Sequence, residues 1–367
     1  MKIDAKDGIQ ETDAEWAVDE LASFKGRFDQ VLKNFLDKKI TEASEIRPEL
    51  GRMLEVCSDF VIEGGKRLRP SFVYFGWKAA GGSGNEDAIL QAAIPMELVH
   101  AGALVHDDVM DNSDLRRNKP TVHKVFEREM GSNEVGRSLA IVAGDMMLAL
   151  ADEAMSAYPS FDGRYKEARE CFDKMCEEIN YGQHLDVVGN LLPEVSEEWI
   201  MQVMRYKTAG YTVEKPLLVG AILGGASDEV IKGLSEYGIK LGIAFQIKDD
   251  ILGMFGSEKK VGKPVNSDLK EGKKTLLVSK TFERLLIDGR QENLERFKSV
   301  LGDHNLTEGD YKWCQNLMRE TGAMDYCQQL VVKLTEEAAA ALENVEIDGE
   351  ARRFLLGISE FLVAREY

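Results

Sequence analysis

Apolar residues recur every three or four positions along most of the chain, which is the spacing of one face of an α-helix. The pattern is clear in Trp16, Leu21, Phe24, Phe28, Val31, Leu32 and Phe35, and again in Leu139, Val142, Met146 and Leu150. Alternating apolar and polar positions bounded by hairpin turns, which would predict strands, are lacking. The sequence therefore predicts an all-α fold, a bundle of about a dozen helices.

The helical pattern is interrupted only at short clusters of glycine, proline and asparagine. These breaks fall at Gly81–Gly84, Asn118–Pro120, Pro193, Gly224–Gly225, Gly256–Pro264 and Gly302–Asn305. None resembles a linker between two cores, and the chain has only 8 Pro in 367 residues. We therefore expect one domain over residues 1–367, with the N-terminal helical segment at about 1–45 on its periphery.

Composition excludes several classes of protein. A formal charge of −18 argues against general nucleic-acid binding, because neutralising phosphates requires a basic surface. Five cysteines without a Cys-x-x-Cys pair favour neither a disulfide framework nor a zinc site. The N-terminus lacks a signal-peptide pattern, and the longest nearly uncharged apolar stretch, Pro216–Ala226, is far shorter than the roughly 20 residues of a membrane span. We expect a cytoplasmic protein without an integral membrane segment.

Two carboxylate clusters follow apolar helical runs. Asp107, Asp108 and Asp111 follow the run Ala92–Val105, and positions 107 and 111 lie one helical turn apart on the same face. Acidic side chains near a helix C-terminus are unfavourable unless a cation is present, and Mg²⁺ takes one or two carboxylates together with phosphate oxygens. Considered by itself, such a cluster has an alternative interpretation, in which the aspartates are solvent-exposed side chains at a helix end.

The second cluster, Asp249 and Asp250, ends the apolar run Ile239–Ile247. If the two clusters face one another, their combined negative charge would be stable only around several divalent ions and their phosphates. The two helix ends together therefore predict a site for metal-bound phosphates.

Basic residues are conspicuous in so acidic a chain. The run Gly64–Pro70 places three cations beside a glycine pair, and Arg116-Arg117 follows the first carboxylate cluster by five residues. Any one of these, or of Lys207, Lys263 and Lys273, would ordinarily be a surface ion-pairing residue. Together with two acidic clusters, they describe a site for two diphosphates, since arginine forks and lysine point charges bind that group.

With these residues the chain resembles the trans-isoprenyl diphosphate synthases, also called polyprenyl synthetases, and most of all a geranylgeranyl diphosphate synthase. The resemblance runs from about residue 50 to about residue 280. It is carried by GGKRLRP at Gly64–Pro70, ELVHAGALVHDDVMDNSDLRR at Glu97–Arg117, KTA at Lys207–Ala209, FQIKDD at Phe245–Asp250 and GKPVNSDLKEGKKT at Gly262–Thr275.

The resemblance implies a fold, a reaction and its partners. The fold would be a helical bundle of the isoprenoid synthase type with a deep central apolar cavity, usually a homodimer. The reaction would be the Mg²⁺-dependent condensation of isopentenyl diphosphate with an allylic diphosphate such as the dimethylallyl, geranyl or farnesyl compound. Three Mg²⁺ ions per site would be bound by Asp107, Asp108, Asp111, Asp249 and Asp250.

The resemblance also implies roles for the other polar residues. The diphosphate of isopentenyl diphosphate would be held by Lys66, Arg69 and His100, with Arg117 assisting. The allylic diphosphate would be held by Arg116, Lys207 and Lys263. Next to the allylic carbon, where positive charge develops, would lie Thr208 and Gln246.

One position departs from the family pattern. Members often have a third aspartate in the second cluster, where this chain has Gly253. The ion held there would depend more on Asp249, on water, or on another acid such as Asp268.

Product length should depend on the depth of the apolar pocket behind the first cluster. Counting up the helix from Asp107, the residues facing the pocket would be Ala103 and Gly102, then Val99, then Met96. Small residues at the first turn leave the pocket open past a C15 chain, and the floor would be formed by Met96 or by Met146, Met147 or Leu150 of a neighbouring helix. Each isoprene unit is about as long as one helical turn. The prediction is a C20 product, with C25 or longer as the alternative.

Two other functions use the same kinds of motif. A terpene cyclase also combines an aspartate-rich motif with Mg²⁺, but it should lack the isopentenyl-binding run Gly64–Pro70 and Arg117. A non-catalytic partner subunit should have lost part of one carboxylate cluster, and Gly253 is the one sign of such a loss.

Overall fold

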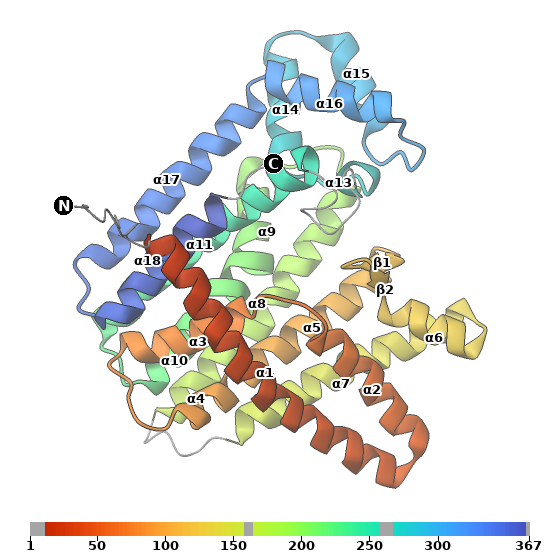
Figure 1. The fold of residues 1–367 in the computed structure, drawn as a ribbon. Coiled ribbons are helices and arrows are strands. Elements are labelled where there is room, and N and C mark those ends of the chain that lie inside the picture. Colours follow the sequence, from red (N-terminus) through yellow and green to blue (C-terminus); the bar gives the residue numbers. More distant parts are fainter. Residues whose placement is uncertain (1–11, 158–163, 257–266, 365–367) are drawn as a thin grey trace, which may run out of the picture.

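The computed structural model describes residues 12–157, 164–256 and 267–364 (Figure 1). Its first half consists of α1 (Asp13–Ile46), α2 (Pro48–Ile62), α3 (Leu68–Ala79), α4 (Glu86–Ala92), α5 (Ile94–Met110), β1 (Leu115–Arg116), β2 (Lys119–Pro120), α6 (Val122–Met130), α7 (Asn133–Ser156) and α8 (Tyr165–Leu191). Its second half consists of α9 (Glu197–Met204), η1 (Arg205–Glu214), α10 (Lys215–Leu223), α11 (Asp228–Phe255), α13 (Ser267–Lys270), α14 (Leu276–Ile287), α15 (Gln291–Val300), α16 (Glu308–Glu320), α17 (Ala323–Glu343) and α18 (Gly349–Val363). The predicted all-α class is confirmed.

Helix boundaries follow local chemistry. Ser132, Ser196, Ser227 and Thr275 each cap a helix by accepting a hydrogen bond from the backbone N–H three residues on. Within the described residues, β-structure is limited to the two-residue antiparallel pair β1–β2. Arg117 and Asn118 connect these strands, both with positive φ, as a tight two-residue hairpin requires.

The apolar side chains form two clusters. One fills the body of the molecule between α1–α8, α10 and α18, and the other lies among α9 and α14–α16. Helices α14–α16 form the upper part of Figure 1. The long helices α11 and α17 pack along each other and contribute to both clusters. The N-terminal half of α11 belongs to the first cluster and its C-terminal half to the second, so this helix joins the two.

The N-terminal helix α1 is more deeply integrated than the expected peripheral position. It crosses the body diagonally in Figure 1 and packs against α2 and α18. Its buried stripe joins the main core through Ala17, Leu21, Phe24, Phe28, Leu32 and Leu36. Removal of this helix would expose a continuous apolar surface.

One helical stretch of the described chain, Glu86–Met110, is long and apolar enough to cross a membrane by length and composition. Of its most apolar window, 72% is buried inside the fold, as expected for a core helix of a globular protein.

Helices α3 and α10 approach each other at two glycines. A Cβ atom at Gly76 would lie 2.1 Å from the carbonyl oxygen of Leu217, and one at Gly220 would lie 1.9 Å from that of Val73. Both neighbours are backbone atoms, so they cannot move aside without displacing a helix. This contact fixes the position of α3, whose N-terminal end reaches the cavity described below.

We predict that Gly220→Ala destabilises the protein by about 1–3 kcal/mol, because overpacking forces a backbone shift. Gly26→Ala is the control: Gly26 lies within α1 with nothing within 4 Å of an added Cβ, so this change should stabilise the protein by about 0.5–1 kcal/mol. Denaturant unfolding of both variants measures the difference. Equal stability of the two variants would contradict the assigned helix contact.

Candidate active site

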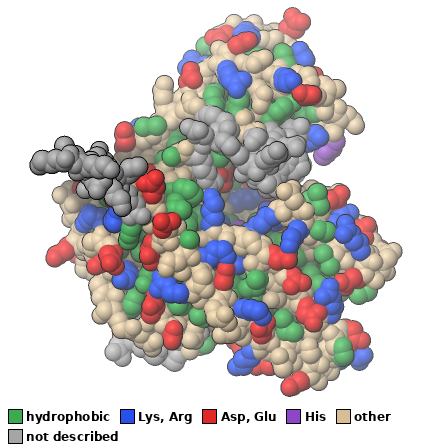
Figure 2. Space-filling model, in the orientation of Figure 1, with side chains coloured by type: hydrophobic (Ala, Val, Ile, Leu, Met, Phe, Trp, Pro, Cys, Tyr) green, Lys and Arg blue, Asp and Glu red, His purple; other side chains and the backbone are tan. Residues whose placement is uncertain are grey.

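A cavity of about 810 Å³ opens where α5, α8, η1 and α11 converge. It is lined by both Asp107 and Asp249, so the two carboxylate clusters share one space. On the face drawn in Figure 2, a recess separates the upper helices from the body, with Lys and Arg side chains at its rim. The other polar residues singled out from sequence that line the cavity are Lys66, Arg69, His100, Arg116, Lys207, Thr208, Gln246, Asp250, Asp268 and Lys273.

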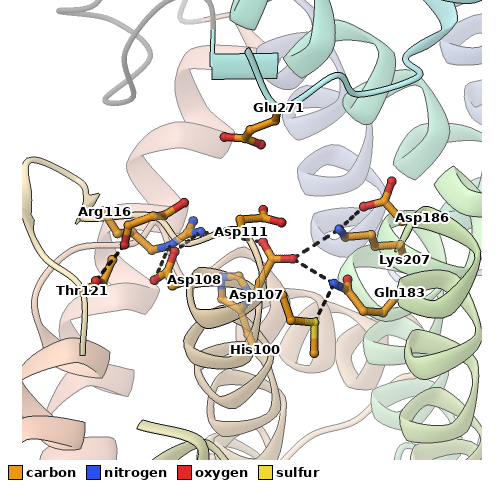
Figure 3. A network of polar contacts seen from close by, with 12 residues as sticks. His100, Asp107, Asp108, Asp111, Arg116, Thr121, Gln183, Asp186, Lys207 and Glu271 are labelled. Atoms are coloured by element: carbon orange, nitrogen blue, oxygen red, sulfur yellow. Dashed lines mark hydrogen bonds and ion pairs between the residues drawn. The ribbon is translucent and has the colours of Figure 1, made fainter. Parts of the chain in front are cut away.

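Asp107 is the centre of a polar network at the end of α5 (Figure 3). Its carboxylate lies 3.3 Å from Lys207 Nζ and accepts a hydrogen bond from Gln183 Nε2 at 3.1 Å. Lys207 also pairs with Asp186 of α8. Burial disfavours the charge of Lys207, but Asp107 and Asp186 outweigh it and raise the pKa of the ammonium group.

Asp108 has a different environment from its neighbours. It is 1% exposed, does not line the cavity, and accepts a forked hydrogen bond from Arg116 Nε at 2.8 and 2.9 Å, with Nη2 2.6 Å away. Consecutive helical residues point about 100° apart, so Asp108 faces the β1–β2 hairpin while Asp107 faces the cavity. The arrangement suits Asp108 for orienting Arg116.

Asp111 caps α5 one turn after Asp107. Burial and the nearby charge of Asp107 raise the pKa of Asp111, although Lys273 lies 3.6 Å from its carboxylate. Burial also opposes ionisation of Asp107, but Lys207, Lys273 and Arg116 outweigh it and lower the pKa of that carboxyl. Asp107 lines the cavity, whereas Asp111 beside it does not and is 26% exposed. A hard divalent cation bound between the two carboxylates would relieve their repulsion.

The second cluster is organised by hydrogen bonds from η1 to α11. Thr208 Oγ1 donates to Gln246 Oε1 at 2.8 Å, and Gln246 Nε2 donates to Asp250 Oδ1 at 2.7 Å. Removal from bulk water, with Asp268 nearby, raises the pKa of Asp250 well above its usual range. This carboxyl therefore also has an excess of negative charge around it.

Lys273 connects the two clusters. Its ammonium group lies 3.6 Å from Asp111, 4.0 Å from Asp268 and 2.7 Å from Glu271. Burial disfavours its charge, but these three acids outweigh it and raise the pKa of Lys273. One lysine thus balances acids from both sides of the cavity.

Gly253 and Asp268 occupy the same place in the second cluster. A Cβ atom at position 253 would lie 2.8 Å from Asp268 Oδ2. A carboxylate from α13 therefore lies where a side chain of α11 would begin. The absence of an acid at position 253 does not leave this side of the cavity without one.

The basic side of the cavity is built on the segment before α3. Arg69 Nη2 donates to Tyr211 Oη and Thr212 Oγ1, both at 2.8 Å. His100 lies on the adjacent α5, and burial together with the charge of Arg69 lowers the pKa of its imidazole well below the usual range. Lys66 completes this side and lies 4.8 Å from the ring centre of Phe361 in α18.

Arg67 points into the protein although it lies between two cavity-lining cations. Its side chain is 0% exposed and pairs with Asp29 of α1 at 2.6 Å and with Glu97 of α5 at 2.5 Å. The left-handed backbone at Arg67, φ 58°, lets Lys66 and Arg69 turn to the cavity. Arg117 does not line the cavity and donates to the carbonyl oxygen of Glu63 at 3.1 Å.

The apolar end of the cavity contains two of the residues predicted to face the growing chain. Ala103 and Val99 line it, one and two turns before Asp107 respectively, together with Leu104, Leu148 and Ile179. Gly102 does not: it faces α7, where an added Cβ would lie 3.0 Å from the carbonyl oxygen of Gly144.

The predicted methionine floor is wrong in this structure. Met96 and Met147 are buried in the main core, Met146 packs against that core, and none of the three lines the cavity. On α7 it is Leu148, one position further along the helix, that reaches it. The last predicted diphosphate ligand, Lys263, lies outside the described residues.

Sequence reasoning missed several cavity residues. Gln183 and Asp186 lie one turn apart on α8, and this spacing with their polarity was the only available signal. Tyr211 and Thr212 were missed because η1 is a π-helix, a geometry that the apolar periodicity does not reveal. Among the described residues, no three acidic, histidine or cysteine side chains already converge as a metal cage. Bound ions would therefore need oxygens from water or a phosphate as well, which is the usual condition for Mg²⁺.

Comparisons with known proteins agree with this geometry. The sequence model of the polyprenyl synthetase family matches residues 51–318. The chain is 34% identical to a geranylgeranyl diphosphate synthase of Methanosarcina mazei, over 88% of this chain and 91% of the relative. It is 31% identical to a geranylfarnesyl diphosphate synthase of Aeropyrum pernix, over 90% of this chain and 99% of the relative.

A similar solved structure is geranylgeranyl pyrophosphate synthase of Corynebacterium glutamicum complexed with isoprenyl diphosphate and magnesium. Its TM-score is 0.88 at 32% identity, covering 94% of this chain and 99% of that one. The paired carboxylate clusters, the opposing cations and the apolar end of one cavity thus occur in a chain that matches a single enzyme family along most of its length. The protein belongs to the polyprenyl synthetase family of prenyltransferases, which use isopentenyl and allylic diphosphates.

Proposed function

We propose that this protein condenses isopentenyl diphosphate with allylic diphosphates to give an all-trans product of C20 length, geranylgeranyl diphosphate. The observation that carries this proposal is one cavity with two acidic clusters and a basic wall at its mouth and aliphatic side chains at its inner end. Such a cavity has separate places for two diphosphates and for one growing hydrocarbon.

The acidic clusters fit the Mg²⁺ on which the family depends. Asp107 and Asp111 from α5, with Asp249 and Asp250 from α11, would hold three ions, and Asp268 would supply the acid that Gly253 lacks. Bound Mg²⁺ stabilises negative charge on the departing diphosphate oxygens. Asp108 would act through Arg116, whose guanidinium it orients.

The allylic diphosphate would lie between Arg116 and Lys207, which face each other across Asp107. These two cations, together with Lys273, would stabilise charge that grows on the leaving group, and they are in place before the bond breaks. Lys263 would assist them. Thr208 donates a hydrogen bond to Gln246, so the lone pairs of its hydroxyl oxygen stay available. They would face the allylic carbon on which positive charge develops. This arrangement favours ionisation of the allylic C–O bond.

Isopentenyl diphosphate would be held on the opposite wall by Lys66, Arg69 and His100. Fixing its diphosphate there leaves the double bond as the nucleophile nearest to the allylic cation, and exclusion of water prevents hydrolysis. Loss of a proton from the new cation restores a double bond, and the released diphosphate is the base available in the site. No covalent bond to the enzyme is required.

We also propose that the active form is a homodimer. The exposed face of α7 carries an apolar stripe in which Val135 is followed seven residues later by Val142, and Ile141 by Leu148. These side chains are 37–51% exposed, unusual for four aliphatic residues on one helix face. Leu148 also lines the cavity, so a second copy packed on α7 would close the cavity wall.

A cytoplasmic location is part of this proposal. All five cysteines are free, and burial raises the pKa of Cys57, Cys171 and Cys314 to about 12, so these thiols are unreactive. Buried reduced thiols are ordinary in a reducing compartment.

The alternative function is synthesis of a longer product of C25 or more, because the cavity has no bulky aromatic side chain at position 99 or 103 to stop the growing chain.

The test is incubation of the purified protein with Mg²⁺, isopentenyl diphosphate and each of three allylic primers, dimethylallyl, geranyl and farnesyl diphosphate. We expect C20 to be the main product from every primer. Asp107→Ala should lower turnover by at least about a thousandfold without a change in thermal unfolding, because it removes a cavity-lining acid and leaves the core packed. A main product of C25 or longer would favour the alternative, and an active Asp107→Ala variant would contradict the metal assignment.

A further prediction concerns the chain length of the product. Ala103→Phe should place an aromatic ring across the apolar end one turn below Asp107 and shift the main product to C15. Gly102→Ala is the matched control, because position 102 faces α7, and this variant should lose stability but keep the product length. Chromatography of the dephosphorylated products measures both. An unchanged product of Ala103→Phe would contradict the assigned direction of chain growth.

A further inference from the structure

Tyr211 lies between two residues that are proposed to hold isopentenyl diphosphate. Its hydroxyl oxygen is 2.8 Å from Arg69 Nη2 and 3.4 Å from His100 Nδ1. The Arg69 guanidinium also lies 4.4 Å from the centre of the tyrosine ring. All three residues line the cavity.

The π-helix η1 creates this position. Lys207 and Thr208 face the acidic end of the cavity, and Tyr211 and Thr212 follow four residues later on the same face, next to the basic wall. In a π-helix each residue turns less than in an α-helix, so these four side chains share a narrower arc. One short segment thus contacts both proposed diphosphate positions.

Chemistry fixes the direction of the Arg69 hydrogen bond, and that of the His100 hydrogen bond depends on the imidazole tautomer. A guanidinium can only donate, so the Tyr211 oxygen accepts from Arg69. The proton of the hydroxyl is then free to be donated to His100 Nδ1. A neutral imidazole with Nδ1 as acceptor carries its hydrogen on Nε2. Burial and the surrounding arginines, which lower the pKa of His100, favour this neutral form.

We propose that Tyr211 is a positioning residue that selects the His100 tautomer with the proton on Nε2, so that this nitrogen can donate a hydrogen bond to an oxygen of the isopentenyl diphosphate. The inference rests on the proposed place of that substrate. Tyr211 is not among the residues that the sequence motifs singled out. A proton on Nε2 would allow the uncharged His100 to donate a hydrogen bond to an anion.

The hydroxyl is not required to hold Arg69 in place. Thr212 Oγ1 accepts from the same Nη2 atom at 2.8 Å, and the ring contact does not involve the hydroxyl. Tyr211→Phe therefore removes the bond to His100 while the other contacts of Arg69 remain. We expect the KM for isopentenyl diphosphate to rise about 5- to 20-fold, with the KM for the allylic diphosphate within about twofold of wild type.

Tyr206→Phe is the matched control, because it removes a hydroxyl from the same π-helix at a residue that does not line the cavity. It should leave both KM values unchanged. Lys66→Ala tests the place of the substrate independently and should raise the KM for isopentenyl diphosphate. Thermal unfolding of all three variants checks that they are folded.

The tautomer is read directly by NMR of the full-length protein labelled with ¹⁵N-histidine. The chain has five histidines, and the signals of His100 are those lost in His100→Gln. We expect a protonated Nε2 and an unprotonated Nδ1 in the wild type, and a mixture of tautomers in Tyr211→Phe. Addition of isopentenyl diphosphate should shift the Nε2 signal in the wild type.

The outcomes distinguish the role of Tyr211 from the proposed position of isopentenyl diphosphate. A proton on Nδ1 of His100 in the wild type, or an unchanged KM in Tyr211→Phe while Lys66→Ala raises it, overturns the role of Tyr211 and leaves the proposed substrate position intact. If Lys66→Ala also leaves the KM for isopentenyl diphosphate unchanged, the substrate position itself is wrong and the inference fails with it.

Discussion

The structure depends on balancing many carboxylates within one cavity. Two like charges 4 Å apart repel by about 4 kcal/mol at the effective dielectric constant of a protein surface, so the helix ends that bring Asp107, Asp111, Asp250 and Asp268 together need counter-charges. Lys207 and Lys273 supply them, and each pairs with acids from more than one element. In the proposed function the same lysines would bind diphosphate once divalent ions were bound by the acids.

The packing of the fold supports this balance. The two acidic clusters are delivered by α5 and α11, whose buried faces anchor them in the surrounding core. Close glycine contacts hold α3 against α10, and the pair of Arg67 with Asp29 and Glu97 ties the basic wall to both α1 and α5. The positions of the charged groups are therefore set by rigid helices, which is the condition for electrostatic stabilisation without reorganisation.

Several site residues could be predicted because their types and spacing carry the chemistry. Asp107, Lys207, Asp249 and two of the cations of Gly64–Pro70, Lys66 and Arg69, were identified from motifs, and the structure places them in one cavity. Asp108 was assigned to the site by the family resemblance and Gly102 by counting along the helix, yet a step of one residue turns a side chain about 100° around the helix, and neither lines the cavity. Gln183 and Asp186 were missed because such residues are ordinary on a helix surface, and Tyr211 because the apolar periodicity does not reveal the π-helix that places it.

The sequence by itself determined the helical class, the acidic surface and the motifs that identify the family, because hydrophobic periodicity and residue type are local properties. Only the tertiary structure decided which side chains meet across the cavity. Asp107 and Lys207 are 100 residues apart in the chain, and Arg69 and Tyr211 are 142 apart. Periodicity states which face of a helix is buried but not which helix covers it, so Asp268 beside Gly253 and Tyr211 beside His100 follow only from the packing of whole helices.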